Sequence, residues 1–110
     1  MQVINVYDVE EEQIEGVDKV TLRWVIDEKV GAKNFAMRYF VIEKGGETPL
    51  HSHDWEHEMF VVKGEGYISD GKNKIKIKAG DAIFVEPNEP HHVINEDSPK
   101  LEIICLIPIK

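Results

Sequence analysis

Short apolar runs separated by turn-forming residues dominate this chain. Glycine, asparagine and aspartate tolerate the backbone angles of tight turns, and they recur at Gly45-Gly46, Gly64-Glu65-Gly66 and Asp70-Gly71. The runs between these turns are rich in β-branched and aromatic residues, and helical periodicity is scarce. The pattern therefore predicts an all-β protein.

About nine strands are expected, at residues 19–27, 35–43, 50–53, 58–63, 66–69, 74–78, 82–85, 91–95 and 101–107. Nine strands in 110 residues leave little room for a helix, so a small antiparallel barrel or a double-sheet jelly roll is expected. Lysine and isoleucine alternate along 74–78, which predicts one wet and one buried face, and the lysines suit an edge strand.

The composition fits one domain with one core, spanning residues 1–110. A net charge of −8 does not suit binding to nucleic acid or to an anionic membrane surface. No signal peptide or membrane span is expected, and the single cysteine makes the cytoplasm the simplest location.

The N-terminal segment, residues 1–18, is the least regular part of the sequence. Val3, Ile4 and Val6 form a weak strand that could add to the sheet of a neighbouring copy, so a homodimer is the expected assembly.

The five histidines are clustered, and imidazole is the commonest protein metal ligand near neutral pH. His51 and His53 have the same parity, so both rings point the same way if the segment is extended. His57 shares that parity, although the residues before it could interrupt the strand. His91 could approach from a later strand, whereas His92 should point to the opposite face.

Two stretches resemble the two motifs of the cupin superfamily. Gly45-x₅-His51-x-His53-x₃-His57-x₆-Gly64 resembles the first motif, and Gly80-Asp81-x₄-Glu86-Pro87-Asn88-x₂-His91-x₃-Asn95 resembles the second. Together they occupy residues 45–95. The resemblance implies a single-domain cupin double-stranded β-helix, and it implies that His51, His53, His57 and His91 bind one divalent transition metal.

Two residues depart from the usual cupin pattern. His57 stands where cupins usually have glutamate, which resembles a subset of small monocupins with an all-histidine site. Four neutral imidazoles would leave the ion its full +2 charge, which favours anionic ligands. Asn88 replaces a turn glycine and should tolerate the left-handed conformation. Glu56 or Glu58 could orient a ligand imidazole or could simply be solvated.

Manganese is the first choice of metal, and iron, nickel, copper, cobalt and zinc also suit such a donor set. Zinc could instead close a tetrahedron on all four histidines and be structural.

Four further residues are expected near the pocket. If Glu102 faces outward, then Ile103 and Cys105 face inward. Arg38 shares a strand face with Phe40; inside the barrel it could hold an anionic substrate, and outside it would form a surface ion pair.

The leading functional hypothesis is a metal-dependent oxidoreductase, of the dioxygenase or peroxide-using type, that acts on a small organic substrate. It rests on the resemblance to oxygen-using cupins. The alternatives are a non-redox isomerase or decarboxylase and a non-catalytic binding module for a metal or small molecule, since the fold hosts all three.

Overall fold

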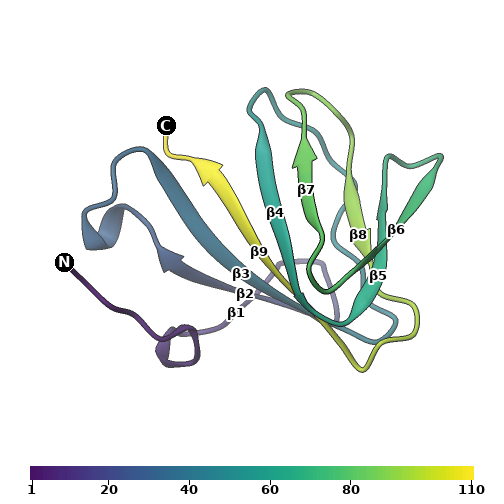
Figure 1. The fold of residues 1–110 in the computed structure, drawn as a ribbon, viewed down its shortest axis with the longest axis horizontal. Helices are drawn as coiled ribbons and strands as arrows, with labels where there is room; N and C mark the ends of the chain where they lie inside the picture. Colours follow the sequence, from purple (N-terminus) through teal and green to yellow (C-terminus); the bar gives the residue numbers. More distant parts are fainter.

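The computed structural model describes residues 1–110 and is built almost entirely of strands (Figure 1). The strands are β1 (Glu12–Gln13), β2 (Val20–Ile26), β3 (Phe35–Glu43), β4 (His57–Lys63), β5 (Glu65–Ser69), β6 (Lys74–Lys78), β7 (Ala82–Val85), β8 (His92–Ile94) and β9 (Lys100–Pro108). The only helical segments are two short 3-10 turns, η1 (Val6–Asp8) and η2 (Glu28–Val30). The predicted all-β class is therefore confirmed. No helix has the length and apolarity that a membrane crossing requires.

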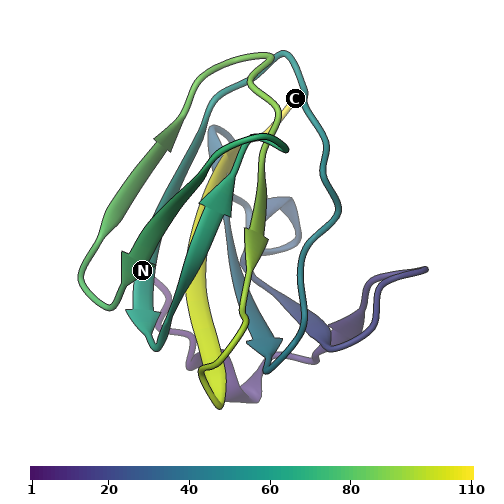
Figure 2. The same ribbon diagram turned by 90° about the vertical axis from the view of Figure 1, so that its right-hand side faces the viewer.

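The strands form two antiparallel sheets that face each other. The larger sheet has the order β1-β2-β3-β9-β4-β7 and the smaller sheet the order β6-β5-β8. The sheets lie close together at one end of the molecule and diverge toward the other (Figure 1). A long connection from β3 to β4, residues 44–56, runs the height of the barrel beside β8 (Figure 2).

The register of the larger sheet aligns inward-facing side chains in rows across the strands. In one row Leu22 pairs with Phe40, Phe40 with Ile103, and Ile103 with Val61. Side chains alternate along each strand, so these residues and those two positions away share the inner face. Val61 and Ile103 belong to the buried core. Apolar burial of this kind is the main favourable term that holds the two sheets together.

The expected strand at 50–53 is wrong. The 44–56 connection pairs with the β8 region at only two isolated points, Glu47–Ile94 and His51–His91. Pro49 lies between these points and has no N–H to donate, which interrupts a continuous ladder. The segment is therefore an extended crossing, held by these two bridges and by further backbone hydrogen bonds at Gly45, Gly46, Thr48 and His53.

Two smaller expectations also fail, whereas the expected outward position of Glu102 is confirmed. No strand forms at Val3–Val6, because the chain there is exposed and then enters η1. Ile75 is 68% exposed although Ile77 is buried, so the inner face predicted for β6 is only half realised. β6 is nevertheless an edge strand, as its lysines suggested. Glu102 lies on the outer face but is buried, where it accepts a 2.8 Å hydrogen bond from the Tyr39 hydroxyl.

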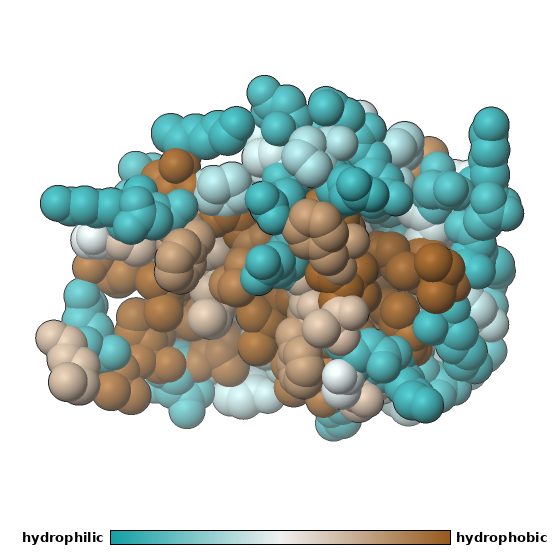
Figure 3. Space-filling view, turned by 45° about the horizontal axis from the view of Figure 1, so that its top comes forward, coloured by the Kyte–Doolittle hydropathy of each residue, from teal (hydrophilic) through white to brown (hydrophobic).

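Apolar side chains also reach the surface. In an oblique view from the end at which the sheets diverge, they occupy the middle of the visible face, and hydrophilic side chains border them (Figure 3). Phe35, Leu50, Phe60 and Phe84 are among the exposed large hydrophobic residues of the molecule. The outer surface of the barrel is therefore less polar than a strict alternation of apolar and polar residues along the strands would make it.

Asn88 and Gly64 are two of the turn residues that have a positive φ. Asn88 adopts φ 68°, which confirms that asparagine can replace glycine there. Gly64, between β4 and β5, has φ 85°, and a Cβ at this position would collide with the Lys100 carbonyl. Gly64 is therefore required both by its backbone angle and by the close approach of a neighbouring chain segment.

Gly64→Ala should destabilise the protein more than Gly16→Ala. Gly16 has a similar φ of 75°, but nothing lies within 4 Å of a Cβ added there. Gly16→Ala therefore measures only the cost of placing alanine at a positive φ, about 1–2 kcal/mol. We expect Gly64→Ala to cost at least about 1 kcal/mol more, measured as the free energy of unfolding in urea. Equal costs would show that the contact with Lys100 relaxes freely.

Candidate metal centre

A pair of backbone hydrogen bonds brings the two sequence motifs together. The His51 N–H donates to the His91 carbonyl at 3.2 Å, and the His91 N–H donates to the His51 carbonyl at 2.9 Å. This antiparallel bridge joins the 44–56 connection to the chain just before β8. Residues 40 positions apart in sequence are thereby fixed opposite each other, with their side chains on the same side.

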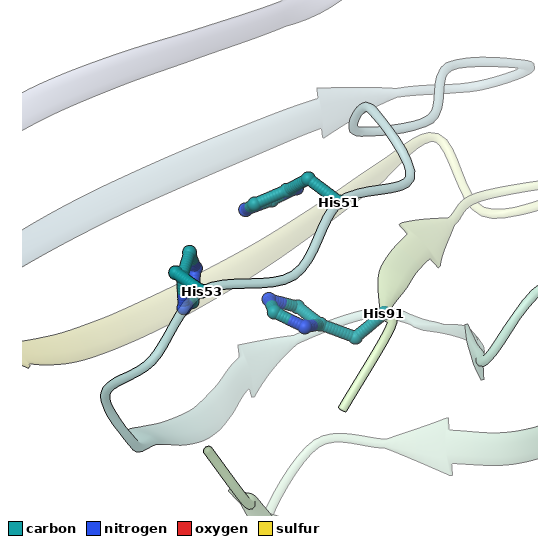
Figure 4. Close-up of side chains that lie close together, drawn as sticks. All are labelled: His51, His53 and His91. Atoms are coloured by element: carbon teal, nitrogen blue, oxygen red, sulfur yellow. The ribbon is translucent and has the colours of Figure 1, made fainter. Parts of the chain in front are cut away.

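Three histidines converge at this bridge. One ring nitrogen each of His51, His53 and His91 lies within 4.8 Å of the other two (Figure 4). The ring centroids are 4.6 Å apart for His51 and His91 and 5.1 Å apart for His53 and His91. The structure thus forms a three-histidine cluster rather than the four-histidine group expected from the sequence. His92 lies outside the cluster.

Backbone carbonyls orient the clustered rings. His51 Nδ1 lies 2.7 Å from the Pro49 carbonyl, and His91 Nδ1 lies 2.8 Å from the Glu89 carbonyl. A carbonyl only accepts, so both Nδ1 atoms carry the proton and donate. A neutral ring then has an unprotonated Nε2 that is free to bind a metal, the arrangement typical of metal-binding histidines. His53 Nδ1 has a longer contact, 3.4 Å, with the Trp55 carbonyl.

His57 lies directly behind the cluster, at the start of β4. Its ring stacks on His53 with centroids 4.2 Å apart, and its centroid is 5.0 Å from that of His91. Its Nδ1 is 3.6 Å from the Cys105 sulfur. His57 is only 3% exposed, and this burial is the main cause that lowers its pKa to about 3, with the neighbouring His53 and Arg38 adding to the effect.

His57 is therefore neutral near pH 7. Burial also lowers the pKa of His53 and His91. The Nε2 atoms of His57 and His91 are buried and have no hydrogen-bond partner. Buried polar atoms without a partner are rare because they cost free energy. A divalent metal ion would satisfy such nitrogens, so the residues present fit a metal site.

His51 and His91 of the cluster, together with His57, line a cavity of about 320 Å³. The four predicted pocket residues, Arg38, Phe40, Ile103 and Cys105, all line this cavity. Most of the remaining wall is apolar, and it contains no aspartate or glutamate. A cavity of this size is at the lower end of the range that holds small organic ligands.

Several features of the site escaped the sequence analysis. The carbonyls of Pro49 and Glu89 orient the rings, whereas Glu56 and Glu58 are exposed and bond to none of them. Trp55 stacks on His53 with centroids 4.4 Å apart. A backbone carbonyl has no signature in the sequence, so only the geometry could identify these partners.

The chain belongs to the cupin family, because residues 38–107 match the family model described as the Cupin domain. The all-β cupin fold inferred from the two motifs is thereby confirmed. The histidine cluster lies within the matched residues and makes this a cupin with a candidate metal site.

Particular relatives differ in what they do. The polyketide cyclase RemF of Streptomyces resistomycificus superposes with a TM-score of 0.93 at 29% identity, covering 100% of this chain and 80% of the cyclase. A predicted oxalate decarboxylase of Thermotoga maritima superposes with a TM-score of 0.86 over 99% of this chain and all of that one; at 23% identity it shows the fold alone.

Curated relatives match a smaller part of the chain. The oxalate-binding protein of Thermotoga maritima is 34% identical over 64 residues, which are 57% of this chain and 53% of that protein. The chain spans about half the length of the curated relatives it matches.

Acid should destabilise the metal-free protein through His57. The His57 side chain takes up a proton near pH 6.5 in the unfolded chain but only near pH 3 in the folded protein. The free energy of unfolding therefore falls as the pH drops below about 6.5. We expect a loss of about 2 kcal/mol between about pH 8 and pH 5 from this group. Urea unfolding of chelator-treated protein measures it.

His57→Gln should make that pH dependence less steep without abolishing it, because burial also lowers the pKa of His53 and His91. His92→Gln, outside the cluster, is the matched control. A His57→Gln variant with the same pH slope as the parent would contradict the assignment.

Proposed function

We propose that this chain is a metal-dependent enzyme that polarises a carbonyl oxygen of a small, largely apolar organic molecule without net oxidation. The observation that carries the proposal is the convergence of unprotonated histidine nitrogens on the wall of an apolar cavity that has no carboxylate. The reaction centre must therefore come from what the histidines hold.

We further propose that His57 joins His51, His53 and His91 as the fourth ligand, as the cupin motifs imply. Support comes from its buried Nε2, which has no partner, and from its stacking on His53. A small rotation of the ring toward the cluster would bring that nitrogen closer, and the neighbouring Cys105 contact at 3.6 Å is weak enough to allow it.

The chain's own residues would prepare the site in two ways. The Pro49 and Glu89 carbonyls hold two rings in the tautomer that binds metal. Apolar residues such as Met59 and Val93 exclude water and lower the local dielectric. A bound divalent metal supplies Lewis-acid polarisation of a substrate oxygen.

The likeness to RemF supports non-redox chemistry, because it extends over the whole chain and that protein is a polyketide cyclase. An oxidoreductase is the second candidate. The observation in its favour is the all-nitrogen donor set, which suits iron and copper as well as zinc. Manganese remains the first choice of ion from the sequence, and elemental analysis of the purified protein would identify it.

The assembly and location also remain predictions. We propose a homodimer, in which a second copy would cover exposed apolar residues such as Phe60 and Phe84 on the outer face of β4 and β7. Light scattering that gives the mass of one chain would exclude it. The cytoplasm remains the predicted location, because the single cysteine is free and buried.

Metal binding should depend on the four proposed ligands. Loss of a group that only orients a ligand costs 10–100-fold in affinity, so His91→Ala or His57→Ala should weaken zinc binding by at least about 100-fold. Competition with a chromogenic chelator measures this effect, and His92→Ala serves as the matched control. If His57→Ala binds zinc like the parent while His91→Ala does not, the site has three histidines.

The choice of chemistry has its own test. In D₂O, zinc-loaded and manganese-loaded protein should both accelerate deuterium exchange at the methyl group of acetophenone, measured by NMR under anaerobic conditions. His91→Ala controls for exchange caused by free metal. Turnover that appears only with oxygen and a redox-active ion would contradict the proposal and support the oxidoreductase.

A further inference from the structure

Arg38 is a cation without an anionic partner. The four salt bridges of the structure involve Arg23, Lys74, Lys76 and Lys110, and none involves Arg38. Its side chain is half-buried on the inner face of β3 and lines the cavity beside the histidines. A charge removed from water without a partner is costly, so a fold that keeps one requires a reason.

The surroundings hold Arg38 in place without neutralising it. Its guanidinium carbon lies 5.6 Å from the centroid of the Trp24 ring and 5.1 Å from that of Phe40. Its Nη2 donates to the Cys105 sulfur at 3.0 Å, because Arg38 and Cys105 are direct cross-strand partners. Its Nε is buried and has no partner. The guanidinium is therefore positioned by two aromatic rings and by the Cys105 sulfur, while part of its donor capacity is unused.

The cavity offers nothing else that could balance this charge. Its wall contains no aspartate or glutamate, and its histidines cannot supply a negative charge. An anionic molecule that enters the cavity would supply the charge that the wall lacks.

We propose that Arg38 binds the carboxylate of an aromatic or similarly apolar ligand whose remaining part fills the cavity toward the histidines. A guanidinium matches a carboxylate through parallel hydrogen bonds, and a charged pair gains strength away from water. The apolar wall, formed by residues such as Leu22, Ile42 and Ile103, suits the body of the ligand. This inference rests on the proposed function only in that it places the ligand in the same cavity as the substrate. Binding of the carboxylate by Arg38 requires no metal.

The experiment uses two probes of nearly the same shape, the anionic 2-naphthoate and the neutral 2-naphthamide. Chelator-treated wild-type protein should bind 2-naphthoate at least about tenfold more tightly than the amide, by calorimetry. Arg38→Met should lose this preference and keep its affinity for the amide. Arg38→Lys, which keeps the charge but not the planar fork, should retain part of it.

Arg23→Met is the matched control, because Arg23 lies on the adjacent strand β2 and is paired with Glu11. It should bind both probes like the wild type. A wild-type measurement avoids any question of folding: the ¹⁵Nε–¹Hε signal of Arg38 should shift when 2-naphthoate is added and should not shift with the amide.

The outcomes separate this inference from the metal proposal. Preference for 2-naphthoate in metal-free protein that disappears in Arg38→Met supports it, whether or not zinc binds. The inference is overturned if no preference exists, if Arg38→Met keeps the preference, or if 2-naphthoate binds without moving the Arg38 signal. Preference that appears only after zinc loading and survives in Arg38→Met would show that the metal holds the anion.

Discussion

The paired backbone hydrogen bonds between His51 and His91 are the contact on which the candidate site depends. They attach the 44–56 connection to the smaller sheet at the point where two histidines must face each other. Pro49 prevents this connection from pairing along its whole length, so the bridge is local and its geometry is sharply defined. Further backbone hydrogen bonds on either side of it, from Thr48 to Val93 and from Asn88 to His53, hold the same two segments together.

The site contains polar groups in an apolar environment, and some of these groups lack a hydrogen-bond partner or a counterion. His57 and His91 are almost fully buried, are neutral because of that burial, and keep a nitrogen without a partner. Arg38 keeps a charge without a counterion on the same wall. Natural proteins tolerate such violations mainly where a ligand completes the interactions, so both features indicate that the cavity is built to be filled.

Cross-strand register connects these features. Trp24, Arg38, Cys105 and Met59 are successive partners across β2, β3, β9 and β4, and His57 lies two residues from Met59 on the same face. One row of the larger sheet therefore links the cation to the histidine that departs from the usual cupin pattern. Since interiors are close-packed, a substitution in this row would be felt by both groups.

The sequence by itself determined the all-β fold and the presence of histidines that could hold a metal, because these depend on local alternation, turn residues and ligand chemistry. It did not determine that the 44–56 connection pairs at isolated points, that backbone carbonyls orient the rings, or that His57 lies behind a cluster of three. Only the tertiary structure decided these matters, because each depends on distances between segments that are remote in the chain. The position of Arg38 is a further example. Strand alternation could not show whether its side chain lies inside or outside the barrel, and the structure places it in the cavity wall.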